Sequence, residues 1–240
     1  ARLAERRVVG SSIKWEDNAV GRSQVTSGRS LDVLGSQQTG EVFWNLGSAE
    51  LYEEAVRRRE AQIAHLGPLV ALTGQHTGRS PKDKFVVRDA ERAGEVWWGA
   101  NNQPLEPEKV EPLLTRMRAY VRDVDLFVQD CYVGADARYR MRIRVVTEYA
   151  WHSLFARNLF IHMPPDAASA HDPQFTVIDL PRFHADPSID GTNSETFIVV
   201  DFARKLVLIG GTEYAGEIKK SMFTIMNHRM PKQGVLPMHC

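Results

Sequence analysis

Apolar and polar residues alternate in several short segments of this chain, as they do in half-buried β-strands. In segment 139–147, Met141, Ile143 and Val145 alternate with three arginines, which predicts a strand with one buried and one basic face. We expect those arginines to be solvent-exposed or paired with acidic neighbours. Further apolar segments bounded by turn residues predict strands at 68–73, 84–88, 126–132, 175–180, 196–202 and 205–209.

Four other segments have features of helices. Ser48 is a good N-cap for a helix over 49–59, whose early glutamates and late arginines match the helix dipole. A second helix opens at Glu106-Pro107 and places apolar residues on one face up to Val121, although Pro112 inside it predicts a kink. The other two are predicted at 148–160 and from residue 217 onward. The mixed order of predicted strands and helices along the chain predicts an α/β (mixed α+β) fold. We expect its sheet to be mixed and not doubly wound.

Residues 1–40 are rich in Ser, Gly and Arg and lack a sustained apolar period. We therefore predict an irregular N-terminal extension there and one folded domain over residues 41–233.

Composition and charge narrow the class of protein. The chain has 240 residues and 43% apolar content, enough for a real core. Thirty basic residues balance thirty acidic ones, so the net charge favours neither nucleic acid nor an acidic membrane. No apolar run reaches the length of a membrane span, and residues 1–7 lack the core of a signal peptide. Cys131 and Cys240 are too few for a disulfide framework or a zinc site. We expect a soluble, cytoplasmic protein.

The segment 73–84, T-G-Q-H-T-G-R-S-P-K-D-K, offers amide groups, hydroxyls and positive charge to an anion. It fits a phosphate-binding P-loop poorly, because Gly74 and Gly78 enclose three residues instead of four and Arg79 replaces the lysine. Arginine grips a carboxylate or phosphate through two parallel hydrogen bonds. Our hypothesis is that a small carboxylate or phosphate binds at Arg79. The alternative is a glycine-rich turn with solvated charges before the strand at 84–88.

A second glycine-rich loop, 210–216, lies between a predicted strand and a predicted helix. Lys219 and Lys220 follow in the first turn of that helix, where the dipole is positive and each lysine repels the other. Both effects favour the neutral amine, which can act as a base or bind a metal. A solvated lysine pair is the alternative, and the glycine loop with Tyr214 favours the functional interpretation.

The histidines show no metal-binding spacing. Glu148 and His152 share one helix face, but two residues do not make a metal site, so we expect a packed or capping role. We assign no role to His162, His171 or His184.

With both loops in view, the chain resembles the N-terminal half of ATP-dependent phosphoenolpyruvate carboxykinase from about residue 41 to the end. Several of its segments match family motifs and occur in the family's order: 77–84, 144–148, 151–160, 193–195, 209–212, Tyr214, 216–220 and 238–240. Residues 1–40 share little with the family.

The resemblance implies the entry step of gluconeogenesis, in which oxaloacetate and ATP give phosphoenolpyruvate, CO2 and ADP. Mn2+ and Mg2+ are the implied cofactors, and ATP is the co-substrate. Loss of CO2 leaves an enolate that a divalent metal can stabilise, and the enolate oxygen must then meet the γ-phosphoryl group in line.

The resemblance also implies roles for five residues. Arg79 holds the substrate carboxylate, and Tyr214 lines the substrate and CO2 site. Lys219 is catalytic and helps to orient the departing carboxyl group. Lys220 binds substrate, takes part in catalysis and, with His239, binds Mn2+ close to the γ-phosphate of ATP.

Three departures from the family qualify this expectation. In the family a nucleotide-binding domain with the P-loop follows His239; residues 234–240 would be its start, and we expect the chain alone to be inactive. The sequence Asn-His-Arg-Met-Pro at 227–231 replaces Asn-Tyr-Leu-Leu-Pro, which puts its packing in doubt. The carboxylate of Glu213, next to Tyr214, would favour the charged form of a nearby lysine. A non-catalytic domain that binds an oxoacid or another anion, and a structural remnant, are the alternatives.

Overall fold

The computed structural model describes residues 31–35, 39–164 and 171–237. Most of the predicted N-terminal extension and the predicted metal ligand His239 therefore lie outside the described residues.

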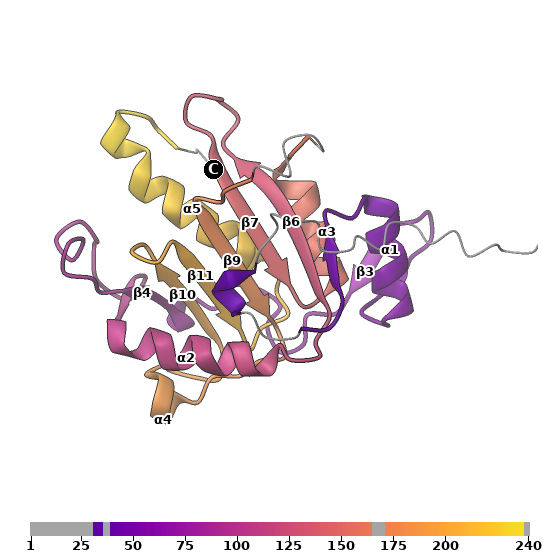
Figure 1. The fold of residues 1–240 in the computed structure, drawn as a ribbon, viewed down its shortest axis with the longest axis horizontal. Helices are drawn as coiled ribbons and strands as arrows, with labels where there is room; N and C mark the ends of the chain where they lie inside the picture. The colour runs from indigo at the N-terminus through magenta and orange to yellow at the C-terminus, as the bar shows by residue number, and fades with distance from the viewer. Residues whose placement is uncertain (1–30, 36–38, 165–170, 238–240) are drawn as a thin grey trace, which may run out of the picture.

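A mixed sheet of nine strands forms the centre of the molecule (Figure 1). Its order is β1-β6-β7-β9-β11-β10-β4-β5, and the short β8 pairs with β6. β7, β9 and β11 are parallel to one another, whereas β6/β7 and β10/β11 are antiparallel pairs. The prediction of an α/β fold with a mixed sheet flanked by helices is confirmed. The strands are β1 (Val42–Trp44), β4 (Lys84–Val87), β5 (Gln103–Leu105), β6 (Leu126–Val133), β7 (Met141–Thr147), β8 (Ile161–His162), β9 (Phe175–Leu180), β10 (Phe197–Asp201) and β11 (Leu206–Gly210).

The predicted helices are all present. They are α1 (Ser48–Arg57), α2 (Pro107–Tyr120), α3 (Ala150–Leu159) and α5 (Gly216–Arg229), joined by the short α4 (Pro187–Asp190) and the 3-10 turns η1 (Asp32–Leu34), η2 (Pro81–Asp83) and η4 (Pro231–Gln233). The predicted N-cap of α1 is wrong by one residue, because Gly47 holds that position and its N–H donates to the Glu50 carboxylate. α2 continues past Pro112 as one helix.

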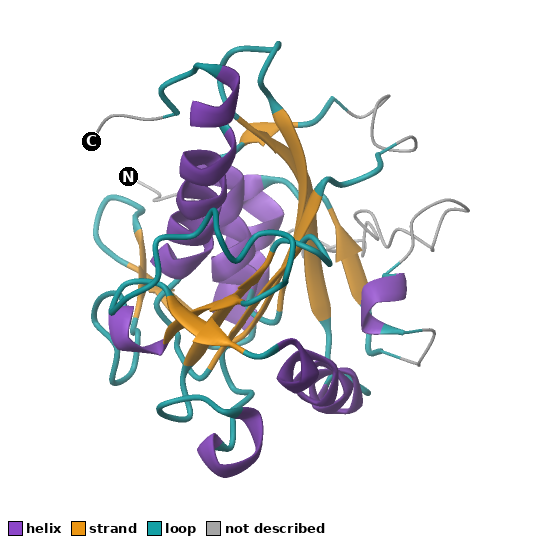
Figure 2. Ribbon diagram, turned by 90° about the vertical axis from the view of Figure 1, so that its left-hand side faces the viewer, coloured by secondary structure: helices purple, strands orange, loops and turns teal. Residues whose placement is uncertain are grey.

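Helices cover both faces of the sheet (Figure 2). Val199 and Leu208 pack with α2 on one face, whereas their neighbours Val200 and Val207 pack with α5 on the other. This switch at every residue is the two-residue period of a strand, and it explains why the central strands are apolar throughout. α1 and α3 enclose a smaller cluster with Phe127 of β6.

Arg144 of β7 is not on a solvated basic face. It is 6% exposed, and its guanidinium binds both carboxylate oxygens of buried Asp130 at 2.7 and 3.1 Å. Of the two outcomes expected for these arginines, pairing with an acidic neighbour holds for Arg144, while Arg142 is exposed. The neighbouring strand supplies the partner, because Asp130 and Arg144 are directly opposite in the β6/β7 register.

The segment predicted as a strand over 68–73 is shorter in the structure and lies outside the main sheet. β3 (Leu69–Ala71) pairs with β2 (Ala61–Ile63) in a separate two-stranded sheet. The loop 73–84 therefore connects this small sheet to β4 of the main sheet.

None of the helices in the described part of the chain is long and apolar enough to cross a membrane.

Replacing Leu113 with Ala should lower the free energy of unfolding by about 2–5 kcal/mol, because the fully buried side chain of α2 would leave a cavity against the sheet. Leu72→Ala is the matched control: Leu72 is 83% exposed, and its truncation should change stability by less than about 0.5 kcal/mol. Urea unfolding of both variants measures the difference, and equal losses would contradict this assignment of the core.

Candidate functional site

Arg79 and Lys220, which lie far apart in the sequence, line the same cavity. The cavity has a volume of about 340 Å³ and lies between the loop 73–84 and the first turns of α5. Lys84 and Glu217 also line it. The structure thus brings together Arg79 of the loop 73–84 and Lys220 of the helix that follows the second glycine loop.

A buried hydrogen bond joins the loop 73–84 to the first turn of α5. The backbone N–H of Ser80, directly after Arg79, donates to Oε1 of Glu217 at 2.8 Å, and both residues are buried. Glu217 is the second residue of α5, so its carboxylate also lies where the helix dipole favours negative charge. The bond fixes the backbone beside Arg79 relative to the helix that carries Lys220.

The cavity is positively charged. Three basic side chains line it, those of Arg79, Lys84 and Lys220. Among the described residues that line it, Glu217 supplies the one carboxylate. Burial lowers the pKa of Lys84, and the charge of Arg79 adds to this effect while Glu217 opposes it. Burial also raises the pKa of Glu217, against the Ser80 hydrogen bond and the two nearby cations. An anion in this cavity would offset the repulsion among the cations.

Lys84 already has neutral partners on the wall of the cavity. Its ammonium donates to the Thr224 hydroxyl at 2.9 Å and to the Asn102 side-chain oxygen at 3.3 Å. Lys220 instead lies with its ammonium 5.3 Å from the centre of the Phe223 ring, a cation–π contact.

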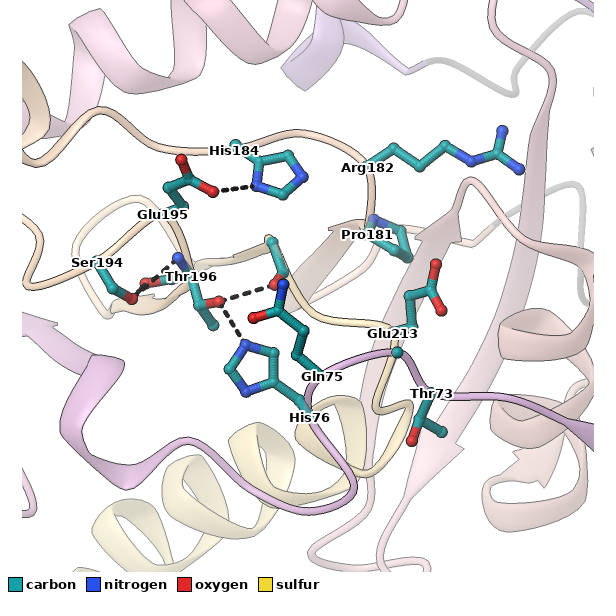
Figure 3. Close-up of a pocket in the computed structure, with 12 residues that line it drawn as sticks. Thr73, Gln75, His76, Pro181, Arg182, His184, Ser194, Glu195, Thr196 and Glu213 are labelled. Carbon is teal, nitrogen blue, oxygen red and sulfur yellow. Dashed lines mark hydrogen bonds and ion pairs between the residues drawn. The ribbon is translucent and has the colours of Figure 1, made fainter.

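His76 anchors the start of the loop 73–84 (Figure 3). Its Nδ1 lies 3.0 Å from the Ser80 hydroxyl and its Nε2 lies 3.0 Å from the Thr196 hydroxyl. Thr196 donates its single hydroxyl hydrogen to the carbonyl of Gly211 at 2.7 Å, so His76 Nε2 must be the donor to Thr196. One histidine therefore connects the loop to the start of β10 and to the glycine loop before α5.

Residues 193–195, which belong to the family motifs, hold the other end of the loop. The Ser194 hydroxyl donates to the Asp83 carboxylate at 2.8 Å, and the Asn193 side-chain amide donates to the carbonyl of Lys82. Both contacts join the 3-10 turn η2 to the segment that precedes β10.

Tyr214 lies over the first residue of α5. A Cβ on Gly216 would come within 2.4–2.8 Å of the far end of the Tyr214 side chain, so a larger residue there would displace the ring from this position. Tyr214 is half-buried and is not among the described residues that line the cavity of Arg79. The structure places it near the site without showing a contact with Arg79 or Lys220.

Lys219 lines a different cavity. Its neighbours there are mostly apolar and include Phe160, Met222 and Met226, in a groove of about 340 Å³. Phe223 lines both this groove and the cavity of Arg79 and Lys220. The predicted catalytic role of Lys219 remains a prediction.

The carboxylate of Glu213 does not share a described cavity with either lysine. It accepts a hydrogen bond from the Tyr149 hydroxyl at 2.9 Å. It also lines a larger cavity of about 510 Å³ with Arg182, His184 and Glu195, in which the charges are mixed (Figure 3).

The unusual residues at 227–231 pack within the domain. The His228 ring lies 4.5 Å from the Phe202 ring, the Arg229 guanidinium contacts the sulfur of Met141 at 3.0 Å, and Met230 is buried. The end of α5 therefore has well-packed partners in this chain.

Comparison with known proteins identifies the family of this chain. The family model described as phosphoenolpyruvate carboxykinase matches residues 40–240. The chain belongs to the phosphoenolpyruvate carboxykinase family. The resemblance to this family that the sequence motifs indicated is confirmed, and the residues that line the cavity of Arg79 and Lys220 lie within the matched range.

Curated relatives are similar over most of this chain. The phosphoenolpyruvate carboxykinase (ATP) of Thermus thermophilus is 55% identical over 214 residues, and that of Brucella suis biovar 1 is 54% identical over 211. The enzyme of Geobacter sp. (strain M21) is 48% identical over 218 residues. These alignments cover 87%, 88% and 91% of this chain but 40%, 39% and 41% of the relatives. The chain thus spans about two fifths of the length of the curated relatives it matches.

Sequence reasoning missed two residues of the site. Glu217 directly precedes the family's Ile-Lys-Lys sequence, and an acidic residue in the first turn of a helix was a usable signal. His76 lies inside the loop we selected, but its partner Thr196 is distant in sequence and nothing local identifies it.

Replacing Glu217 with Gln tests the electrostatics of the cavity. The pKa of Glu217 is raised above 4.5 in the folded protein. Protonated Glu217 therefore stabilises the fold fully below pH 4.5, and this stabilisation is lost as the pH rises through the pKa that Glu217 has in the folded protein. Since Gln keeps an oxygen for the Ser80 N–H and removes the buried charge, we expect the variant to be more stable than wild type at pH 7. This advantage should shrink below pH 4.5.

Thermal unfolding at pH 4 and pH 7 measures the effect. Glu53→Gln, on the exposed side of α1, is the control and should show no such change with pH. A Glu217→Gln variant that is less stable than wild type at pH 7 would show that attraction to the cations outweighs the cost of burial.

Proposed function

We propose that this domain binds the oxoacid substrate of a phosphoenolpyruvate carboxykinase (ATP), in the cavity lined by Arg79 and Lys220. The reaction of the whole protein is then the ATP-dependent conversion of oxaloacetate to phosphoenolpyruvate, CO2 and ADP. The domain supplies the carboxylate-binding side of that reaction.

One observation carries this proposal: Arg79 and Lys220, predicted from separate motifs, line one positively charged cavity. Oxaloacetate and phosphoenolpyruvate are both small polyanions, which such a cavity would attract. Arg79 is exposed at the cavity, so its planar fork is available to a ligand carboxylate.

The residues have distinct tasks in this proposal. Arg79 binds a carboxylate of the substrate and so orients the substrate, which places the bond to the departing CO2 for cleavage. Tyr214, whose side chain lies over Gly216, forms the wall of the CO2 site. Lys219 orients the departing carboxyl group; in the structure it lines the neighbouring groove, which shares Phe223 with the cavity of Arg79 and Lys220.

A divalent metal is part of the same proposal. Lys220, as a neutral amine, and His239 would hold Mn2+, with Mg2+ accompanying ATP, and the metal would stabilise the enolate. His239 lies outside the described residues, and within the described ranges no three His, Cys, Asp or Glu side chains are grouped to hold a metal. The described residues do not complete a metal site, so we assign no step of the reaction to it.

A non-catalytic oxoacid-binding domain is the second candidate. It is favoured by the fact that the anion cavity is formed within the described residues. The two candidates differ in turnover and agree on binding.

Arg79→Ala should weaken the binding of oxalate, a stable dicarboxylate, by about tenfold or more, because a charge-assisted bidentate contact is worth about 1.5–3 kcal/mol. Arg79→Lys should recover only part of the affinity, since lysine keeps the charge but loses the fork. Isothermal calorimetry with oxalate and with phosphoenolpyruvate measures both variants. Arg138→Ala, which removes an exposed arginine between β6 and β7, is the matched control and should bind as wild type does.

An activity assay with oxaloacetate, ATP and Mn2+ accompanies the calorimetry. We expect binding without turnover from this chain, and turnover would overturn that expectation. Oxalate affinity that is the same in wild type and Arg79→Ala would contradict the proposed site.

A further inference from the structure

A fully buried histidine lies directly behind the loop that carries Tyr214. His152, in the first turn of α3, is 0% exposed. Its Nδ1 lies 2.8 Å from Oδ2 of Asp179, and its Nε2 lies 3.0 Å from the carbonyl oxygen of Glu213. The expectation that His152 is packed is confirmed, and its contacts indicate a more specific role.

The carbonyl of Glu213 and the N–H of Tyr214 belong to one peptide bond. His152 holds the oxygen of that bond, and the Tyr214 N–H donates to the Thr212 hydroxyl at 3.1 Å. The peptide that precedes Tyr214 is therefore held at both ends by buried side chains. Its orientation determines where the Tyr214 ring leaves the backbone above Gly216.

These contacts require a proton on Nε2 of His152 and a second proton between its Nδ1 and Asp179. A carbonyl oxygen only accepts hydrogen bonds, so Nε2 must donate to Glu213. Asp179 is 1% exposed, and among the described residues its other oxygen has no hydrogen-bond partner, so its charge depends on a proton at Nδ1. Beside an ionised Asp179, a neutral imidazole has one N–H, and either the carboxylate or the carbonyl would then face a lone pair. A protonated Asp179 that donates to a neutral ring is the other arrangement with the same distances, and the raised pKa of His152 favours the imidazolium.

We propose that His152 is a positioning residue for the oxoacid site: as an imidazolium paired with Asp179, it holds the Glu213–Tyr214 peptide and thereby Tyr214. A cation in the first turn of a helix goes against the helix dipole, as expected of a residue kept for its tertiary contacts. The role in ligand binding rests on the proposed function; the protonation state and the link to Tyr214 do not.

The other charged groups around His152 support the same state. Burial opposes protonation, but Asp179 and the carbonyl of Glu213 outweigh it and raise the pKa of His152 above 6.5, with a further contribution from Glu60 after α1. Glu60 receives the N–H of Trp151, whose ring lies 4.1 Å from the imidazole.

Other ionisable groups lie one contact further away. Tyr149 lies edge-on to the His152 ring at 5.3 Å and binds the Glu213 carboxylate, and Arg182 donates to the Tyr149 hydroxyl. Glu148, beside Asp179, has its pKa raised mainly by burial.

The raised pKa of His152 makes the stability of the folded protein depend on pH. The protonated His152 ring stabilises the fold fully below pH 6.5, and this stabilisation is lost as the pH rises through the pKa that His152 has in the folded protein. Above that value the neutral ring must release Asp179 or Glu213, and we expect the Tyr214 peptide to shift with it.

Asp179→Asn separates this mechanism from ordinary packing. The amide of Asn can donate to Nδ1 of a neutral imidazole while Nε2–H still holds Glu213, so the loop contact persists without a titrating charge. The double variant His152→Gln/Asp179→Asn supplies a second neutral pair should the single variant fold poorly. Glu60→Gln is the control, because burial raises the pKa of Glu60 to about 7 and its titration overlaps the same range.

NMR spectra of the imidazole nitrogens and of the Tyr214 amide, recorded between about pH 6 and pH 9, test the proposal directly. In wild type and Glu60→Gln we expect both ring nitrogens to be protonated at pH 6.5 and the Tyr214 amide to titrate with the ring. Oxalate affinity should fall by about fivefold or more across the same midpoint, the lower end of usual coupling between sites. Asp179→Asn and the double variant should lack this step.

A singly protonated ring in wild type at pH 6.5, a Tyr214 amide that does not follow the ring, or an unchanged pH step in Asp179→Asn would overturn the proposal. Absence of oxalate binding at every pH would instead refute the proposed function, and the two NMR titrations would still decide the role of His152.

Discussion

The hydrogen bond from the Ser80 N–H to the buried carboxylate of Glu217 is the contact on which the site depends. It joins a loop between two sheets to the first turn of α5, and these segments share no strand pairing. A carboxylate is costly to bury, and the cations Arg79 and Lys84 with the Ser80 N–H reduce that cost. The same cations leave a net positive charge facing the cavity, so one arrangement both fixes the loop and attracts an anion.

The glycine loop before α5 is also held by hydrogen bonds from buried or half-buried side chains. Thr196 accepts from His76 and donates to the Gly211 carbonyl, and His152 donates to the Glu213 carbonyl. Both histidines therefore act on the backbone of the loop that leads to Tyr214. Rigid geometry of this kind is what binding and orienting a small oxoacid requires, because misplacement of about 1 Å is costly.

The sequence predicts the parts of this fold whose signal is local. Long segments with a clear period, such as α5 and β7, were located correctly, whereas β1, β2, β5 and β8 have two or three residues and too short a pattern to detect. For the site, Arg79 and Lys220 could be paired through a resemblance carried by motifs. The structural roles of His76, Glu217 and His152 were not predicted, since each depends on a partner at least sixty residues away in the sequence. The burial of Arg144 is the same case, because its partner Asp130 lies on the adjacent strand.

A crystal structure of this chain with oxalate tests the central claim most directly. We predict oxalate in the cavity, with a carboxylate within about 3.2 Å of both terminal nitrogens of Arg79. The bond between Ser80 and Glu217 should be intact and the loop 73–84 unmoved. Oxalate bound elsewhere, or a loop that must rearrange and break the Ser80 contact to reach it, would contradict the claim that these buried bonds form the anion site in advance.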